Sequence, residues 1–310
     1  MNSLKLTICP RSAFGTPLAG DTLFGQICWA IRERFGNPRL RQLLEGYTEG
    51  YPFVVLSDAF PAGCLPAPAL PKYLLPDAED DSKRSRNAWL PVEGVTRPLR
   101  EWIGTKESTD TDAASRPFAP EVITQNTINR LTGTTGTGQF APRQYVRLEV
   151  KSPRLDIYCI LDEARFSREE LRQVVEDVGQ TGYGRDASTG LGKFTLDGLE
   201  DHRWPSGDRV HVVTLAPCAP DPRALDARHC YFRPLTRFGR HGNVAALMAN
   251  PFKRPVLLLQ TAAFLTLKEP GEPKFLGVGL GGNGTLSTVI PETVHQGYAP
   301  VAPLNAEVEA

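Results

Sequence analysis

A glycine-rich loop between a helix-like run and a strand-like run constrains this chain most. The segment from Gly182 to Phe194 reads G-Y-G-R-D-A-S-T-G-L-G-K-F and contains four glycines, two cations and two aliphatic hydroxyls. Glycine lacks the Cβ atom that keeps a ligand off the main chain, so such a loop can present a row of backbone N–H groups to phosphate. An ordinary glycine-rich connection between a helix and a strand is the alternative for this loop taken alone.

Length and charge narrow the class of protein. A chain of 310 residues can bury a substantial core, and we expect two domains. No apolar run approaches a membrane span, and the N-terminal apolar run is too short for a signal peptide, so we expect a cytoplasmic protein. The formal net charge is zero, so a polyanion has to be bound by a local patch.

Two basic stretches supply such a patch. Seven Lys or Arg lie between Arg223 and Arg254 against the single acid Asp226, and a second basic cluster lies between Arg143 and Arg154. In the first stretch cations alternate with aromatic rings, which is typical of surfaces that bind phosphates and exposed bases. A solvated charged face is the alternative reading.

Cysteine and histidine give no sign of a metal or cofactor. The six cysteines form no C-x-x-C pair, and the five histidines show no ligand spacing such as H-E-x-x-H. We therefore expect neither a zinc site nor a disulfide framework, and no cofactor.

The hydrophobic pattern predicts an α+β fold. Apolar spacing predicts a helix over 21–35, and a capping box formed by Ser167 and Glu170 begins a second helix that ends near Val178. Together with the strands, the order is strand, helix, strand, insertion, strand, helix, strand, which is that of a ferredoxin-like fold. The expected strands lie at 4–9, 53–56, within 145–161 and at 193–199.

Two further expectations concern domain organisation. The polar segment 66–139 is too long for a passive loop, so we expect a projecting arm or hairpin between the second and third strands of a domain spanning 1–205. For 206–310 we expect a smaller, irregular ferredoxin-like domain with strands near 210–215, 230–235 and 256–267.

Other segments also suit ligand contact. The run from Phe14 to Gly25 leads a glycine turn into a helix N-terminus, and 126–143 combines glycines, hydroxyls and arginines. By contrast, the G-x-G-x-x-G match at Gly279 precedes no helix, which excludes a dinucleotide fingerprint. Lys193 is followed by Phe194 rather than Ser or Thr, which excludes a P-loop.

Taken together, these segments resemble a RAMP-superfamily CRISPR protein. The resemblance covers about Phe14 to Leu304, and its motifs in chain order are G-T-P-L-A-G-D-T-L-F-G-Q-I-C-W-A-I, L-S-D-A-F-P-A-G-C-L-P-A-P, I-N-R-L-T-G-T-T-G-T-G-Q-F, the glycine loop, and G-V-G-L-G-G-N-G with V-H-Q-G-Y-A-P-V. This ordered set is similar to the subunit of the type III-A (Csm) effector complex that caps the 5′ end of the CRISPR RNA.

The resemblance implies a non-catalytic RNA-binding scaffold. Its partners would be the 5′ handle of the CRISPR RNA, target RNA through the guide duplex, the large polymerase/cyclase-like subunit and the RAMP backbone subunit. A thumb-like insertion is expected to contact the guide–target duplex. Residues expected to bind RNA are Phe14, Gly15, Asp21, Thr22, Arg130, Thr132, Thr134, Thr135, Gln139, Phe140, Arg143, Gly182, Tyr183, Gly184, Arg185, Ser188, Gly190, Gly192, Lys193, Arg237, Arg240, His295, Gln296 and Tyr298, with Tyr183 stacking on a base.

The rival function is a RAMP-type, metal-independent endoribonuclease that processes CRISPR precursor RNA. Such cleavage requires a positioned general acid and base, and His295 is the best candidate. No second histidine or tyrosine partner accompanies it in the N-terminal region. A glycine-rich nucleotide-binding regulatory domain is a third, weaker alternative.

Overall fold

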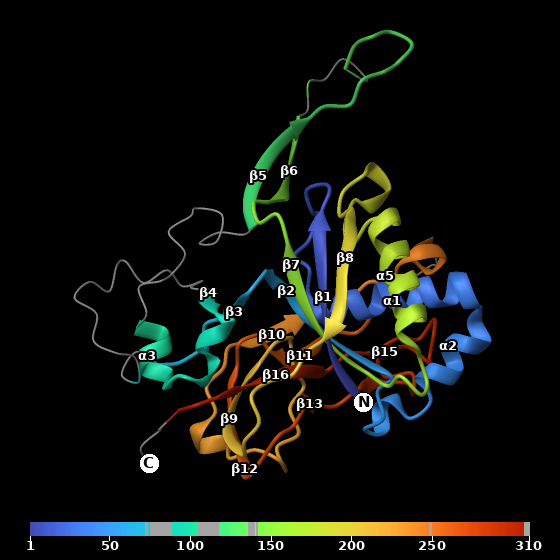
Figure 1. The fold of residues 1–310 in the computed structure, drawn as a ribbon. Helices are drawn as coiled ribbons and strands as arrows, with labels where there is room; N and C mark the ends of the chain where they lie inside the picture. Colours follow the sequence, from blue (N-terminus) through green and yellow to red (C-terminus); the bar gives the residue numbers. More distant parts are fainter. Residues whose placement is uncertain are drawn as a thin grey trace.

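The fold is built around two four-stranded antiparallel sheets. The computed structural model describes residues 1–71, 74, 89–104, 118–135, 140, 142–247 and 250–306. Helices and strands are mixed, which confirms the predicted α+β class (Figure 1).

The first sheet has the strand order β2-β7-β1-β8. Helices α1 and α5 pack on one face of it, over a core formed by alternate residues such as Leu4 and Leu6. The strands are β1 (Asn2–Pro10), β2 (Val54–Pro61), β7 (Leu155–Leu161) and β8 (Phe194–Asp201), and the helices are α1 (Gly20–Phe35), α2 (Asn37–Leu44) and α5 (Arg168–Thr181).

Local signals explain where these helices begin and end. The hydroxyl of Ser167 accepts a hydrogen bond from the N–H of Glu170, whose carboxylate accepts one from the Ser167 N–H, so the predicted capping box begins α5. Gly36, with φ +88°, ends α1 as predicted. The helix α2 that follows was not predicted, although Pro38 suits its first turn.

The insertion between β2 and β7 has two parts. Its first part packs on the body, where Trp102 of α3 (Leu99–Gly104) is buried with Leu90 of β4 (Trp89–Pro91). Its second part is a projecting hairpin, as the sequence predicts, but it extends past the predicted end at residue 139, because β6 belongs to the hairpin and not to the sheet. β5 and β6 form an antiparallel ribbon that extends away from the body (Figure 1). The remaining elements are β3 (Cys64–Pro66), β5 (Phe118–Gln125) and β6 (Arg143–Val150).

The second half of the chain contains a sheet of order β12-β9-β16-β13. The described residues after 206 contain 3₁₀ turns but no α-helix, so a second ferredoxin-like unit is not confirmed. The prolines near the C-terminus lie in a strand. The strands are β9 (Arg209–Thr214), β10 (Pro234–Arg237), β11 (Val256–Leu259), β12 (Phe264–Gly271), β13 (Phe275–Gly277), β14 (Leu280–Gly281), β15 (Val294–His295) and β16 (Tyr298–Leu304).

The two halves share a hydrophobic core, and the buried side chain of Gln296 also joins them; this contact is called the Gln296 tie. Phe60 and Tyr158 from the first sheet are buried with Phe264 and Leu304 from the second. The amide of Gln296, which is fully buried, accepts a hydrogen bond from the Leu56 N–H at 2.9 Å and donates one to the Leu56 carbonyl at 2.8 Å. The division at 205/206 therefore stays a prediction, because packing crosses it.

None of the helices in the described ranges combines the length and apolar character needed to cross a membrane.

The Gln296 tie yields a stability prediction. Gln296→Met keeps the side-chain volume but leaves two buried backbone groups of Leu56 unpaired, so the free energy of unfolding should fall by about 2–4 kcal/mol. Urea unfolding measures this loss. Gln180→Met, at an exposed position on α5, is the control and should change stability by less than about 0.5 kcal/mol. Equal stability of the two variants would contradict the proposed role of the tie.

Candidate nucleic-acid interface

The glycine loop is built on left-handed backbone conformations. Residues 182–194 connect α5 to β8 and lie at the end of the sheet from which the arm extends (Figure 1). The four glycines have positive φ: +98° at Gly182, +78° at Gly184, +96° at Gly190 and +73° at Gly192. Residues other than glycine rarely adopt this region, so the conformation of the loop favours glycine at these four positions.

The four glycines differ in what surrounds them. A Cβ atom on Gly192 would lie 2.1 Å from the carbonyl oxygen of Tyr183, and one on Gly184 would lie 2.1 Å from the hydroxyl of Thr16. A Cβ atom on Gly190 would meet nothing within 4 Å. The loop thus needs Gly192 and Gly184 for close packing, and Gly190 for conformation alone.

Three consecutive backbone N–H groups of the loop are open. Within the described residues, the N–H groups of Gly184, Arg185 and Asp186 donate no hydrogen bond to the protein. Positive φ at Gly184 and at Asp186 (+63°) flanks Arg185. Successive N–H groups in such a turn form a concavity that favours an anion.

Cations lie on this loop and next to it. The ammonium of Lys193 makes no ion pair among the described residues. The guanidinium of Arg185 donates to the Val146 carbonyl and contacts Asp186 at 3.2 Å, so part of its charge is compensated. Arg11, which sequence reasoning missed, is exposed beside the loop, and its backbone N–H donates to the Lys193 carbonyl at 2.7 Å.

Two predicted contact residues are core residues instead. The ring of Tyr183 is fully buried, so the prediction that it stacks on a base is wrong. Its hydroxyl donates to the Pro17 carbonyl at 2.9 Å and accepts from the Ala19 N–H at 3.0 Å. Phe14 is also fully buried, 6.2 Å from the Tyr183 ring. Both rings fix the loop against the start of α1.

Gly15 lies directly under the loop. A Cβ atom there would be 2.1 Å from the carbonyl oxygen of Arg185, so Gly15 permits the close approach of two main-chain segments. Thr22 is half-buried, and its hydroxyl faces Asp21 at 3.3 Å. Ser188 is exposed on the loop.

The C-terminal H-Q-G-Y motif is structural in this conformation. His295, Gln296 and Tyr298 are all buried, and the Tyr298 hydroxyl donates to the Tyr47 carbonyl at 2.5 Å. The prediction that these three side chains contact RNA is therefore wrong for this conformation. They tie β15 and β16 to the first half of the chain.

Asp21, at the start of α1, has a buried carboxylate that contacts two side chains from the second half of the chain. Asp21 is ion-paired with Arg237 of β10 through contacts of 2.7 and 3.1 Å, and the Asp21 side chain is fully buried. Nε2 of His295 lies 3.3 Å from Asp21 Oδ2, a contact without hydrogen-bond geometry. Asp21 is thus inaccessible to RNA, and Arg237 is compensated in charge.

The environment shifts the pKa of two neighbouring carboxyls in opposite directions. Burial raises the pKa of Asp21, but the contacts with His295 and Arg237 lower it more, so the result lies below the ordinary value. Burial raises the pKa of Asp58 to about 7, although Thr261 and the Gly20 N–H donate hydrogen bonds to its carboxylate. The two groups therefore have opposite effects on stability as pH changes.

The arm carries the remaining predicted residues. Arg130, Thr132, Thr134, Phe140 and Arg143 are exposed on it. Thr135 is half-buried in a bridge to Ile128, and Gln139 lies outside the described residues. Elsewhere, Arg240 of the second half is exposed, with its guanidinium 5.7 Å from the Phe252 ring centre.

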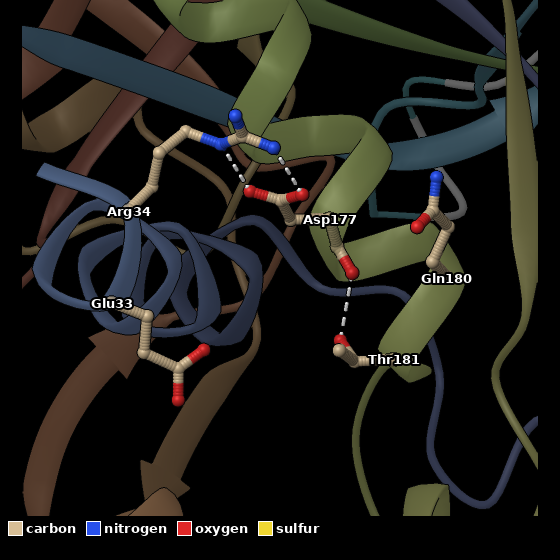
Figure 2. A pocket seen from close by; sticks show the side chains of 5 residues that line it. All are labelled: Glu33, Arg34, Asp177, Gln180 and Thr181. Carbon is tan, nitrogen blue, oxygen red and sulfur yellow. Dashed lines mark hydrogen bonds and ion pairs between the residues drawn. The ribbon is translucent and has the colours of Figure 1, made fainter.

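An open hollow lies between α1 and α5, and an ion pair that joins the two helices lines it (Figure 2). We do not assign it as a binding site. Arg34 donates two hydrogen bonds to Asp177, at 2.6 and 2.7 Å, so its guanidinium is already paired. Among the residues that the structure describes, no three His, Cys, Asp or Glu side chains gather as metal ligands.

The glycine environments yield a matched pair of predictions. Gly190→Ala adds only left-handed strain, so it should lower the free energy of unfolding by about 1–2 kcal/mol. Gly192→Ala adds an overlap with the Tyr183 carbonyl and should cost on the order of 3 kcal/mol or more. Urea unfolding of both variants measures the difference. Equal losses would show that the loop does not pack as described.

Asp58 yields a pH prediction. Its raised pKa means that the folded state holds the proton more tightly, so this contribution to stability is complete below pH ~4 and is lost as pH rises to about 7. Asp58→Asn is neutral throughout, so it should flatten the decline of stability over this interval. Denaturant midpoints at several pH values test this, and a decline identical to the parent's would refute the shift.

Comparison with solved structures identifies proteins of the same fold. No protein-family model and no curated protein matches the sequence. A chain in the crystal structure of a Csm1–Csm4 cassette in complex with pppApA matches with TM-score 0.57 and 17% identity, over 100% of this chain and 99% of that one. A chain in the crystal structure of a Csm3–Csm4 subcomplex matches with TM-score 0.57 and 12% identity, over 98% and 100%. This chain therefore shares its fold with chains in the Csm1–Csm4 and Csm3–Csm4 structures.

Proposed function

We propose that this chain is a non-catalytic RNA-binding subunit of a type III CRISPR effector complex. The observation that carries the proposal is the full-length match to chains in both Csm1–Csm4 and Csm3–Csm4 structures. In this role the subunit holds the 5′ handle of the CRISPR RNA and links the large polymerase/cyclase-like subunit to the backbone filament.

The glycine loop supports the handle-binding part of the proposal. Single-stranded RNA in a distorted path is bound through backbone amides, cations and stacking rather than through a regular groove. The open N–H groups of residues 184–186, with Lys193 and Arg11 beside them, have the chemistry to bind a phosphate. The handle backbone would follow this loop.

The architecture supports the scaffold part. The first half has the element order of a ferredoxin-like unit, and we assign it to that fold. The β5–β6 arm leaves the body beside the glycine loop, which suits a thumb that contacts the guide–target duplex. Its exposed apolar side chains include Leu131 (97% exposed) and Phe140 (74%), both available to pack on bases.

The loop assignment makes a salt-dependent prediction. In Arg185→Ala with Lys193→Ala, handle RNA should bind more weakly, and the slope of log affinity against log salt should shrink by about 1–1.5, because fewer counterions are released. Filter binding across a salt series measures both quantities.

The control for this experiment removes two cations far from the loop. Arg41→Ala with Arg172→Ala changes the net charge equally, at an exposed position on α2 and a half-buried position on α5, and should keep the parental slope. A slope that shrinks equally in both double variants would mean that total charge, and not the loop, governs binding.

The same proposal excludes intrinsic ribonuclease activity. His295 is 8% exposed and its Nε2 faces the carboxylate of Asp21, so an RNA 2′-hydroxyl cannot approach it in this conformation. Purified protein should leave precursor RNA intact with or without divalent cations. Cleavage that His295→Ala abolishes, with folding intact by circular dichroism, would establish the endoribonuclease instead.

A further inference from the structure

The hairpin that runs from Pro234 to Leu259, of which residues 248 and 249 lie outside the described part of the chain, has two chemically different faces. β10 pairs with β11, and the ladder continues through Gly239 with Lys253 and Arg240 with Phe252. On the first strand, residues 234, 236, 238 and 240 are exposed, and the residues between them are buried or half-buried. Alternation of this kind places successive side chains on opposite faces of the ribbon.

The inner face is fixed to the body by polar contacts. Arg237 binds the buried Asp21, and the ring of His241 contacts the Ser287 hydroxyl at 2.9 Å. Both His241 and Ser287 are buried. The ribbon is therefore held in one orientation, and its outer face is presented in a defined way.

The outer face is apolar. Phe238 is 77% exposed, Leu257 71% and Phe252 64%, and Leu247 in the loop of the hairpin is 89% exposed. Residues 232–257 hold six of the fifteen large apolar side chains that are exposed in the described part of the chain. Apolar side chains gathered in one place on a soluble chain mark an interaction surface.

The charge on this face has one sign. No Asp or Glu occurs from Phe232 to Leu257. Arg254 is exposed, and its side chain makes no ion pair or hydrogen bond with the described residues, whereas Arg240 lies over Phe252 and donates to the Ala246 carbonyl. Arg240 and Arg254 therefore have no carboxylate partner among the described residues, so carboxylates on a partner would complement them.

We propose that the outer face of the 234–259 hairpin docks a protein partner whose contact surface is apolar at its centre and carries carboxylates at its rim. Bases stack on rings and guanidinium planes, but the most exposed side chains here include Leu247 and Leu257, which favour burial against another protein. The inference rests on the proposed function, which supplies two protein partners, and assigns this face to one of them.

The test uses the full-length chain with the purified large subunit, the purified backbone subunit and handle RNA, each titrated separately. Phe238→Ser with Leu257→Ser should weaken binding to one protein partner at least tenfold and leave the other partner and the RNA unchanged. Arg254→Glu should weaken binding to that same partner. The matched control is Leu131→Ser with Phe140→Ser on the arm, which also removes one exposed leucine and one exposed phenylalanine and should leave both protein affinities intact.

The outcomes separate this inference from the proposed function. If the parent chain binds both partners and the hairpin variants bind them equally well, the docking face is wrong while the proposed function stands. If the variants lose affinity for RNA alone, the face is a nucleic-acid surface and the inference is overturned. If the parent binds neither protein, the proposed function fails and the inference falls with it.

Discussion

The ion pair between Asp21 and Arg237 joins the first helix of the chain to a hairpin more than two hundred residues later. The Asp21 side chain is fully buried, so its charge has to be matched inside the protein, and the guanidinium of Arg237 matches it. Removing Arg237 alone would leave a carboxylate in a dry environment. The position of the hairpin, and with it the two faces described above, depends on this contact.

Other buried hydrogen bonds also join the second half of the chain to the first half. Gln296 completes the hydrogen bonding of Leu56, and Tyr298 reaches Tyr47, so the C-terminal strand is fixed against β2 and the segment after α2. The start of α1 is in turn held to the glycine loop by Tyr183. A single chain of buried contacts therefore runs from the second half of the protein to the proposed phosphate-binding loop.

Sequence reasoning found the local features of this fold and missed the long-range ones. The capping box at Ser167, the stop at Gly36 and the projecting hairpin follow from short-range rules of backbone geometry and periodicity, and the structure confirms them. Nothing local distinguishes a tyrosine that stacks on a base from one buried under the loop, so Tyr183 was misassigned. The prediction that His295 and Gln296 contact RNA is wrong for the same reason, because their contacts are with Asp21 and Leu56, which are distant in the sequence.

Crosslinking of bound RNA tests the central claim most directly. Handle RNA bound to the full-length chain, irradiated and mapped by mass spectrometry, should crosslink to residues 184–193 and to Arg11, where the open N–H groups and cations lie. Target RNA paired to a guide should crosslink to the arm near Phe140. Crosslinks of handle RNA confined to the outer face of the 234–259 hairpin, with none in the glycine loop, would contradict the account.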